Sequence, residues 1–173
     1  MRQNPRISRN KEVVIWSAAC SSGQEPVTLA LVMLDLLPPG MGVRILATDL
    51  DTQILQKANR GIYTLQECEG IPANYLAKYF VRSGADYQIG DRVRNAISYR
   101  QFNLMSEFVF RHGFDFIFCR NVMIYFDNAT QEALINKFYD QLVTGGLLFT
   151  GHSESMVNKK HRYKPVAPAI WLK

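Results

Sequence analysis

Two acidic residues, Glu25 and Asp49, stand where a carboxylate could bind a polar ligand. Glu25 follows a loop of very small residues, and Asp49 directly follows the predicted strand 43–48. Small side chains let backbone N–H groups approach a ligand closely. In doubly wound α/β proteins, an acid at the end of the second strand accepts hydrogen bonds from ribose hydroxyls. The arrangement predicts a site for a nucleotide-like cofactor, and therefore a cofactor-using enzyme. Asp49 could instead cap the helix that follows it, but Asp51 or Thr52 can also serve as that cap, which would free Asp49.

The loop composition favours one class of cofactor. A dinucleotide site uses Gly-x-Gly-x-x-Gly, because a pyrophosphate rests on the helix N-terminus. Here Gly23 is the only glycine in 13–26, and Glu25 would place negative charge beside a phosphate. These residues favour a ligand with positive charge and no phosphate. S-adenosylmethionine, with its adenosine, its amino acid end and its cationic sulfur, meets these requirements.

Alternating strand and helix patterns predict the frame that holds these carboxylates, an α/β fold with a parallel sheet. Gly61 is well placed to end one helix, and Asn128 with Gln131 resembles a capping box at the start of another. Gly145 and Gly146 are expected to close that last helix. We predict a first strand that begins at residue 13 and further strands over 43–48, 114–119 and 147–150. We predict helices over 26–37 and 51–60, and another one after residue 128.

The stretch 71–100 breaks this alternation and predicts an insertion into the core. Pro72 fits the start of a helix. Residues 86–100 alternate around Gly90 and Asp91, which predicts a small antiparallel hairpin. The core resumes near residue 102, and residues 163–166 and 169–172 predict a final antiparallel pair.

Composition limits the class of protein. The 173 residues fit one domain, and a net charge of +5 favours an acidic partner or simply a soluble surface. Three cysteines without metal-ligand spacing are expected to be small buried hydrophobes in a reduced, cytoplasmic location, and no metal is expected. Neither a signal peptide nor a membrane-spanning segment is evident. Residues 1–12 are expected to be a polar leader or linker remnant, and residues 13–173 the functional domain.

Four blocks of sequence are together specific enough to indicate a family. In chain order they are Trp-Ser-Ala-Ala at 16–19 with Gly-Gln-Glu-Pro at 23–26, Ala-Thr-Asp-Leu-Asp at 47–51, Phe-Cys-Arg-Asn-Val-Met-Ile-Tyr-Phe at 118–126, and Leu-Phe-Thr-Gly-His-Ser-Glu at 148–154. With these blocks the chain resembles, from residue 13 onward, the chemotaxis receptor glutamate methyltransferases, the CheR family. The resemblance implies a Rossmann-like, class I S-adenosylmethionine-dependent methyltransferase core with a small helix and antiparallel β insertion.

The resemblance also implies an activity and a set of residues. It implies methylation of glutamate side chains on the cytoplasmic helices of methyl-accepting chemoreceptors, with S-adenosylhomocysteine as product. Glu25 and Asp49 would contact the amino acid and ribose parts of the cofactor, and Asn103 and Leu104 would border its adenine. The implied cofactor-binding residues are Ser17, Ala18, Glu25, Asp49, Asn103, Leu104, Arg120 and Asn121, and the implied catalytic residues are Tyr125 and Arg120.

This chemistry agrees with what the sequence lacks. A substrate glutamate with a pKa near 4.3 is already ionised at neutral pH, so no general base is needed. Transfer then depends on positioning and electrostatics. Arg120 could steer an acidic partner and Tyr125 could orient the attacking oxygen. The alternatives are a structural ion pair for Arg120 and a core aromatic for Tyr125.

Some features of the chain leave other functions open. Family members carry a helical domain ahead of the core, and because this chain begins a dozen residues before the first strand we expect that domain to be absent. A module that binds cofactor or receptor without catalysis is therefore one alternative. A nucleic-acid methyltransferase is another, suggested by the basic pI of 9.2, but residues 120–123 are not the Asn/Asp-Pro-Pro-Tyr-like motif that many such enzymes carry. Residues 87–99 could present an edge strand to a receptor C-terminal peptide, or form a lid.

Overall fold

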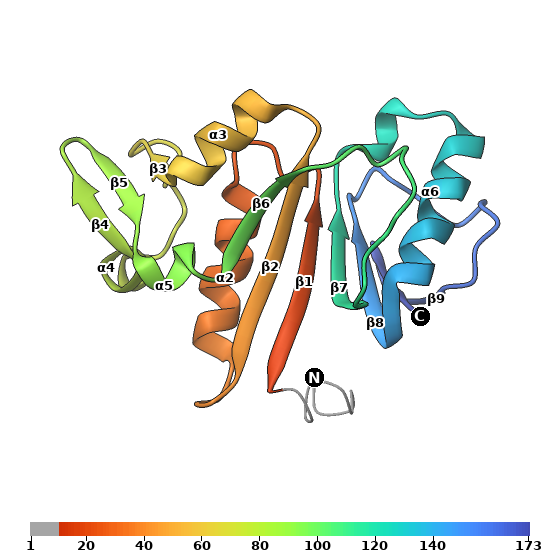
Figure 1. Ribbon diagram of the computed structural model, residues 1–173, viewed down its shortest axis with the longest axis horizontal. Helices are drawn as coiled ribbons and strands as arrows, with labels where there is room; N and C mark the ends of the chain where they lie inside the picture. Colours follow the sequence, from red (N-terminus) through yellow and green to blue (C-terminus); the bar gives the residue numbers. More distant parts are fainter. Residues whose placement is uncertain (1–10) are drawn as a thin grey trace.

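A seven-stranded sheet forms the centre of the computed structural model, which describes residues 11–173 (Figure 1). Its strand order is β6-β2-β1-β7-β8-β10-β9, with the first five strands parallel and β10 antiparallel to both of its neighbours. Strand order reverses beside β1, and doubly wound sheets bind ligands at such a switch point. The predicted Rossmann-like sheet is confirmed. Its strands are β1 (Glu12–Ala18), β2 (Gly42–Asp49), β6 (Ile97–Gln101), β7 (Phe114–Cys119), β8 (Leu142–Thr150), β9 (Lys164–Ala167) and β10 (Ile170–Leu172).

The two faces of the sheet have separate hydrophobic cores. Successive strand residues point to opposite faces, so Ile15 and Trp16, both fully buried, enter different cores. Ile15 packs with α2 (Gln24–Leu36), whose residues Val27 and Leu31 are buried. Trp16 packs with α6 (Asn128–Gln141), through residues such as Phe138. Both faces of β1 are therefore covered, as expected for a central parallel strand.

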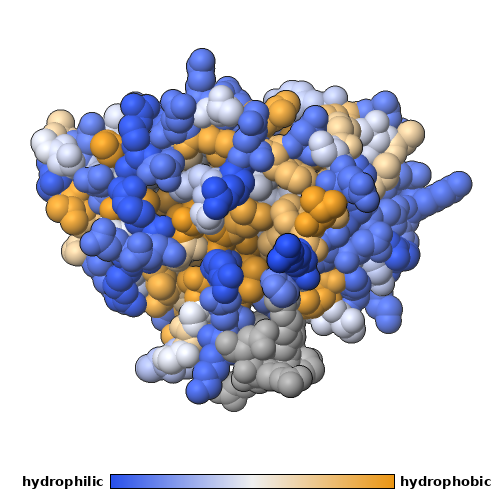
Figure 2. All heavy atoms as spheres, in the orientation of Figure 1, coloured by the Kyte–Doolittle hydropathy of each residue, from blue (hydrophilic) through white to orange (hydrophobic). Residues whose placement is uncertain are grey.

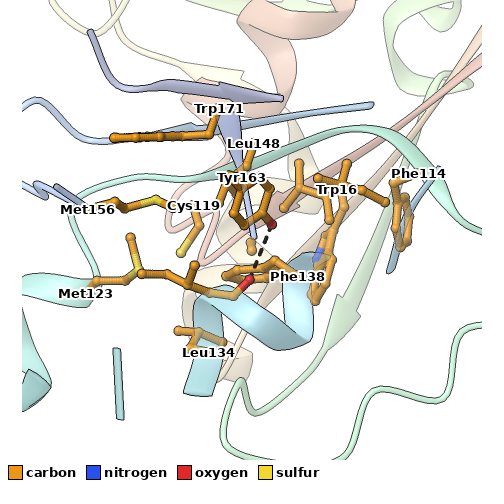
Figure 3. Close-up of a cluster of buried hydrophobic side chains, with 14 of the residues drawn as sticks. Trp16, Phe114, Cys119, Met123, Leu134, Phe138, Leu148, Met156, Tyr163 and Trp171 are labelled. Atoms are coloured by element: carbon orange, nitrogen blue, oxygen red, sulfur yellow. Dashed lines mark hydrogen bonds between the residues drawn. The ribbon is translucent and has the colours of Figure 1, made fainter. Parts of the chain in front are cut away.

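On the face of the sheet that packs against α6, aromatic side chains from an irregular segment cover the part that the helix leaves open. The ring of Trp16 lies within 4.8–5.7 Å, centroid to centroid, of five phenylalanine rings. Figure 3 shows Trp16 with Phe138 on one side and Phe114 on the other. Three of the five rings come from the irregular segment 102–113, which crosses the sheet here. Apolar side chains remain visible across the middle of the molecular face drawn in Figure 2, between hydrophilic ones.

The predicted ends of α3 (Thr52–Arg60) are confirmed. The Asp51 carboxylate accepts hydrogen bonds from the backbone N–H groups of Gln53 at 2.7 Å and Ile54 at 3.3 Å. This is a side-chain N-cap. Gly61 ends the helix with a left-handed φ of 62°. Because Asp51 is the cap, Asp49 is left for other contacts.

The predicted insertion of a small helix with antiparallel strands is confirmed, but its hairpin lies at other residues than predicted. The small second sheet has the order β3-β5-β4, from β3 (Ile62–Tyr63), β4 (Phe80–Ser83) and β5 (Asp86–Ile89), with α4 (Ala73–Tyr79) before β4. Its hairpin turns at residues 84–85, and Gly90 instead precedes the short helix α5 (Asp91–Arg94), because its carbonyl accepts the N–H groups of Val93 and Arg94. Residues 97–100, predicted as part of the hairpin, belong to β6 and pair in parallel with β2 in the main sheet.

Two predictions about α6 are also wrong. Asp127, not Asn128, is its cap, accepting the backbone N–H of Thr130 at 2.8 Å. The helix ends at Gln141, and Gly145 and Gly146 lie within β8. Gly145 donates its N–H to the carbonyl of Lys173, and the Lys173 N–H binds the Gly146 carbonyl. This long-range pairing overrides the local glycine signal. The predicted C-terminal pair, β9 with β10, is confirmed.

We predict that Gly61→Ala destabilises the protein more than Gly84→Ala. Both glycines have a left-handed φ, 62° and 64°, so alanine costs about 1–2 kcal/mol at either position. At Gly61 the new Cβ would also lie 2.5 Å from Cγ1 of Ile89, whereas nothing lies within 4 Å of it at Gly84. Urea denaturation should show an additional loss of about 1–3 kcal/mol for Gly61→Ala. Equal losses would contradict the tight contact between the end of α3 and β5.

Candidate active site

Glu25 joins two other predicted site residues at the carboxyl ends of the central strands. It lies in the first turn of α2, where its Oε1 accepts a hydrogen bond from the hydroxyl of Ser17 at 2.7 Å. Arg120, the first residue after β7, places Nη1 3.4 Å from Oε2 of Glu25. Burial raises the pKa of Glu25 above its usual value, although the Ser17 hydroxyl and the Arg120 charge both act to lower it. The carboxylate is thus held in a partly desolvated position that a ligand cation would stabilise.

Asp49 supports the small-residue loop and keeps part of its hydrogen-bonding capacity. Its Oδ2 accepts the N–H of Ser21 at 2.8 Å and its Oδ1 accepts the N–H of Asp51 at 3.1 Å. An ionised carboxylate has about four lone-pair positions, so roughly two remain for a ligand. Asp49 can therefore hold the loop and accept hydrogen bonds from ribose hydroxyls at the same time.

The loop after β1 is held in an unusual backbone conformation. Ala19, Ser21 and Gly23 all have positive φ values, of 64°, 50° and 89°. A Cβ at Gly23 would lie 2.9 Å from Cβ of Ala58, so the loop packs closely on α3. Such conformations persist only where the surroundings enforce them, and they are concentrated at functional sites.

The cysteines are buried, as predicted. Cys20 lies in the loop, 4% exposed, where burial and the nearby charge of Asp49 raise its pKa to about 12. Its thiol stays protonated at neutral pH and is a poor nucleophile. Cys68 and Cys119 are also free and buried.

The segment after β7 turns sharply and is held by a carboxylate that the sequence did not single out. Asn121 has a left-handed φ of 59°. Glu154, 6% exposed, accepts four backbone N–H groups: its Oε1 binds those of Val122 and Met123 at 2.9 and 2.7 Å, and its Oε2 binds those of Asn121 and Gly151 at 3.0 and 2.6 Å. Glu154 is the last residue of the fourth sequence block, and the signal for its role was a carboxylate close after a buried strand.

Tyr125 and Ile124 face outward from this segment. They belong to the short 3-10 turn η1 (Met123–Tyr125), in which Met123 is 2% exposed and anchors the turn in the core. Tyr125 is 79% exposed and Ile124 51% exposed. The alternative of a core aromatic for Tyr125 is therefore wrong, and its ring is available to a second molecule.

The remaining predicted residues lie around this edge of the sheet. Asn103 follows β6, next to the end of β2, because the N–H of Phe102 binds the carbonyl of Asp49 at 2.9 Å. Leu104 is 8% exposed and packs in the same core as Trp16, so its side chain is largely structural. Ala18, the last residue of β1, has no exposed surface.

Within residues 11–173, no group of three or more His, Cys, Asp or Glu side chains could hold a metal ion. In the same part of the chain, no helix is long and apolar enough to cross a membrane.

We predict that Glu25→Gln raises the free energy of unfolding of the ligand-free protein at pH 7. Folding raises the pKa of Glu25, so the folded state binds its proton more tightly, and stability falls as pH rises from about 4.5 through the folded pKa. The gain from Glu25→Gln should be complete above the folded pKa and absent below about pH 4.5, as measured by urea denaturation across pH 4–8.

Asp35, on the same helix, is a control of opposite sign. Hydrogen bonds from Lys78 and Tyr75 lower its pKa, so Asp35→Asn should slightly reduce stability at pH 7. Loss of stability in Glu25→Gln at pH 7 would contradict the burial argument.

Comparison with known proteins identifies the family. The family model described as "CheR methyltransferase, SAM binding domain" matches residues 2–170. The chain is similar to chemotaxis protein methyltransferase 2 of Vibrio cholerae, at 42% identity over 147 residues that cover 82% of this chain and 51% of the relative. It is also similar to the chemotaxis protein methyltransferase of Escherichia coli, at 38% identity over 161 residues that cover 90% of this chain and 56% of the relative. The chain spans about half the length of the curated relatives it matches.

Solved structures agree on the fold. PKMT2 from Rickettsia typhi in complex with AdoHcy matches 81% of this chain and 21% of that chain, with a TM-score of 0.52 and 13% identity. The DhpI–SAM–HEP complex matches 84% of this chain and 50% of that one, with a TM-score of 0.51 and 14% identity. At such low identity the likeness concerns the fold alone. Because the family model spans nearly the whole chain and about two fifths of the aligned residues are identical in the curated relatives, the chain belongs to the CheR methyltransferase family and corresponds to its S-adenosylmethionine-binding domain.

Proposed function

We propose that the protein transfers a methyl group from S-adenosylmethionine to glutamate side chains of methyl-accepting chemoreceptors, in the cytoplasm, giving glutamate methyl esters. The observation that carries the proposal is the arrangement of Ser17, Glu25 and Arg120 beside Asp49 at the switch point of the sheet. It combines an acid for the amino acid end with an acid for the ribose, and it contains no general base. Membership of the family supports the substrate assignment.

The cofactor-binding roles follow from charge and hydrogen-bonding capacity. The carboxylate of Glu25, disfavoured by burial, would be stabilised by the cofactor's ammonium group. The free lone pairs of Asp49 would accept the ribose hydroxyls. Asn103 follows the adjacent strand and would border the adenine, with Leu104 below it.

The remaining residues would position the acceptor. S-adenosylmethionine supplies the methyl group as a sulfonium and leaves as S-adenosylhomocysteine. Arg120, at the edge of the site, would attract the substrate carboxylate and hold it at short range. The exposed hydroxyl of Tyr125 would orient the attacking oxygen, and Asn121 would line the floor between them. Since the acceptor is already ionised, these residues need only bind and align it.

The receptor contact can also be proposed from the surface. Tyr125 and Ile124 present an exposed aromatic and aliphatic pair to a receptor helix, and the net charge of +5 suits an acidic partner. A receptor peptide could add to the second sheet, but not along residues 87–89, because they lie in its central strand β5, whereas residues 97–99 lie in β6, an edge strand of the main sheet. We place the peptide on β4, the longer of the two outer strands of the second sheet, where Val81 is 62% exposed.

A cofactor-binding module without activity is the second candidate. The observation that favours it is that the chain spans about half the length of its relatives. Such a module would bind S-adenosylhomocysteine but transfer no methyl group until the remaining part of the longer proteins is supplied.

We predict that the protein transfers labelled methyl groups from S-adenosylmethionine to a receptor cytoplasmic fragment. A glutamate methyl ester releases its label as volatile methanol in mild base, so base-labile label is the expected result. A receptor fragment with its methylatable glutamates changed to glutamine is the control. Label that resists base would contradict an ester. Binding of S-adenosylhomocysteine without transfer would favour the inactive module.

We predict that Glu25→Gln and Asp49→Asn each weaken S-adenosylhomocysteine binding by about tenfold to a hundredfold, because each removes a charge-assisted hydrogen bond of about 1.5–3 kcal/mol. Isothermal titration calorimetry measures the affinity. Asp35→Asn, outside the site on the helix that carries Glu25, should leave the affinity unchanged. An unchanged affinity in Glu25→Gln would place the amino acid end of the cofactor elsewhere.

A further inference from the structure

We propose that Glu154 is a positioning residue for methyl transfer: its carboxylate fixes segment 121–125, and with it Asn121 and Tyr125, in the reactive conformation. The proposal rests on the proposed function for its kinetic consequence, but not for the structural one. It deepens that function, because no role for Glu154 follows from the cofactor or from the substrate alone.

The geometry around Glu154 is that of an anion-binding backbone concavity filled by the protein's own carboxylate. Asn121, in the left-handed region with φ of 59°, turns the chain so that three successive N–H groups converge. Backbone conformations of this kind form nests that bind anions. The Glu154 oxygens occupy this nest, at 2.7–3.0 Å from the N–H groups of residues 121–123.

The Glu154 carboxylate, with the backbone N–H groups that it accepts, forms a clamp. This clamp joins the segments that follow two neighbouring strands. Oε2 of Glu154 also accepts the Gly151 N–H at 2.6 Å, so the ends of β7 and β8 share one carboxylate. A Cβ at Gly151 would lie 2.6 Å from that oxygen and 2.8 Å from Oδ1 of Asn121, so any larger residue would displace these side chains. The N–H groups at the start of the turn are thereby satisfied within the protein.

A second anchor holds the far end of the same turn. The Gln131 side chain donates from Nε2 to the carbonyls of Met123 at 2.9 Å and Phe126 at 2.7 Å. Glu154 therefore holds the N–H groups at one end and Gln131 the carbonyls at the other. Between them lies Tyr125, the last residue of η1, which is 79% exposed, so the turn sets the position of its backbone.

Glu154 lies close to the candidate cofactor site, and its carboxylate binds backbone N–H groups in place of a cationic side chain. Within residues 11–173, none of the salt bridges includes Glu154. Its negative charge lies near enough to Glu25 to contribute to the raised pKa of that residue. A surface groove of about 400 Å³ reaches Glu154, with walls that include His152, Val157 and Pro168. A small anion from solvent can therefore reach the nest when the side chain is removed.

Two variants test the role. Glu154→Ala leaves four N–H donors without an acceptor, and Glu154→Gln turns an N–H₂ group toward part of them. Glu132→Gln is the matched control, since Glu132 accepts one backbone N–H, from Lys160 at 3.1 Å, outside the site. The measurements are folding by circular dichroism, amide hydrogen exchange at residues 121–123, S-adenosylhomocysteine affinity, and kcat for receptor methylation with and without added formate.

We expect both Glu154 variants to fold and to exchange amides 121–123 at least tenfold faster. Their kcat should fall at least tenfold and by a larger factor than their cofactor affinity, because Glu25 and Asp49 lie on other elements and Asn121 is the one implied cofactor contact within the segment 121–125. Formate, a carboxylate that fits the emptied nest, should restore part of the kcat of Glu154→Ala. Glu132→Gln should match the wild type in every measurement.

Three outcomes would overturn the proposal. One is unchanged exchange at residues 121–123 in folded Glu154→Ala, which needs no substrate to observe. Another is a kcat equal to that of the wild type. The third is a parallel loss of kcat and cofactor affinity that follows only the folded fraction, which is what a merely structural role gives. If the wild-type protein methylates no receptor fragment, the proposed function fails instead. The hydrogen-exchange experiment then still tests whether Glu154 holds residues 121–123.

Discussion

The register of three neighbouring parallel strands determines where the candidate site residues lie. Ala18 at the end of β1 stands opposite Thr48 in β2 and Cys119 in β7. The residues that follow, Asp49 and Arg120, therefore emerge at one level, on either side of the loop that leads to Glu25. Residues separated by 95 positions in the chain meet in an ion pair for this reason. The two packed cores on either face of β1 hold the register, so the site depends on the sheet being covered on both sides.

Residues at this edge of the sheet are held in unfavourable states, either a partly buried charge or a left-handed backbone, which cost free energy in the absence of a ligand. Glu25 is a half-buried carboxylate whose charged form is disfavoured, and Ala19, Ser21 and Asn121 have left-handed backbones. Carboxylates compensate by accepting backbone N–H groups: Asp49 holds the loop after β1, and Glu154 the turn after β7. Under the proposed function, these contacts would place the binding groups before the cofactor arrives and so reduce the entropy lost on binding. Stability and cofactor binding would then oppose each other at Glu25.

The sequence predicted those parts of the structure that local pattern controls. Residues 114–119 are apolar on both faces and form β7 over that range, and Asp51 caps α3 through its own side chain. The wrong predictions concern segments whose structure depends on backbone hydrogen bonds to residues far away in the sequence. Gly145 and Gly146 resemble a helix end but bind Lys173 in a strand, and 97–100 resembles a hairpin arm but pairs with β2. In the site, the acids after strands could be identified from position alone. The role of Glu154 could not, because its partners are backbone groups brought near only by the fold.

A crystal structure of the protein with S-adenosylhomocysteine would test the central claim most directly, that Glu25 holds the amino acid end of the cofactor and Asp49 its ribose at the switch point of the sheet. The account predicts the cofactor's ammonium group within hydrogen-bonding distance of the Glu25 carboxylate and its ribose hydroxyls on Asp49, with Asn121 and Glu154 in their present conformation. A cofactor bound away from these two carboxylates, or one whose amino acid end lies on Asp49, would contradict it.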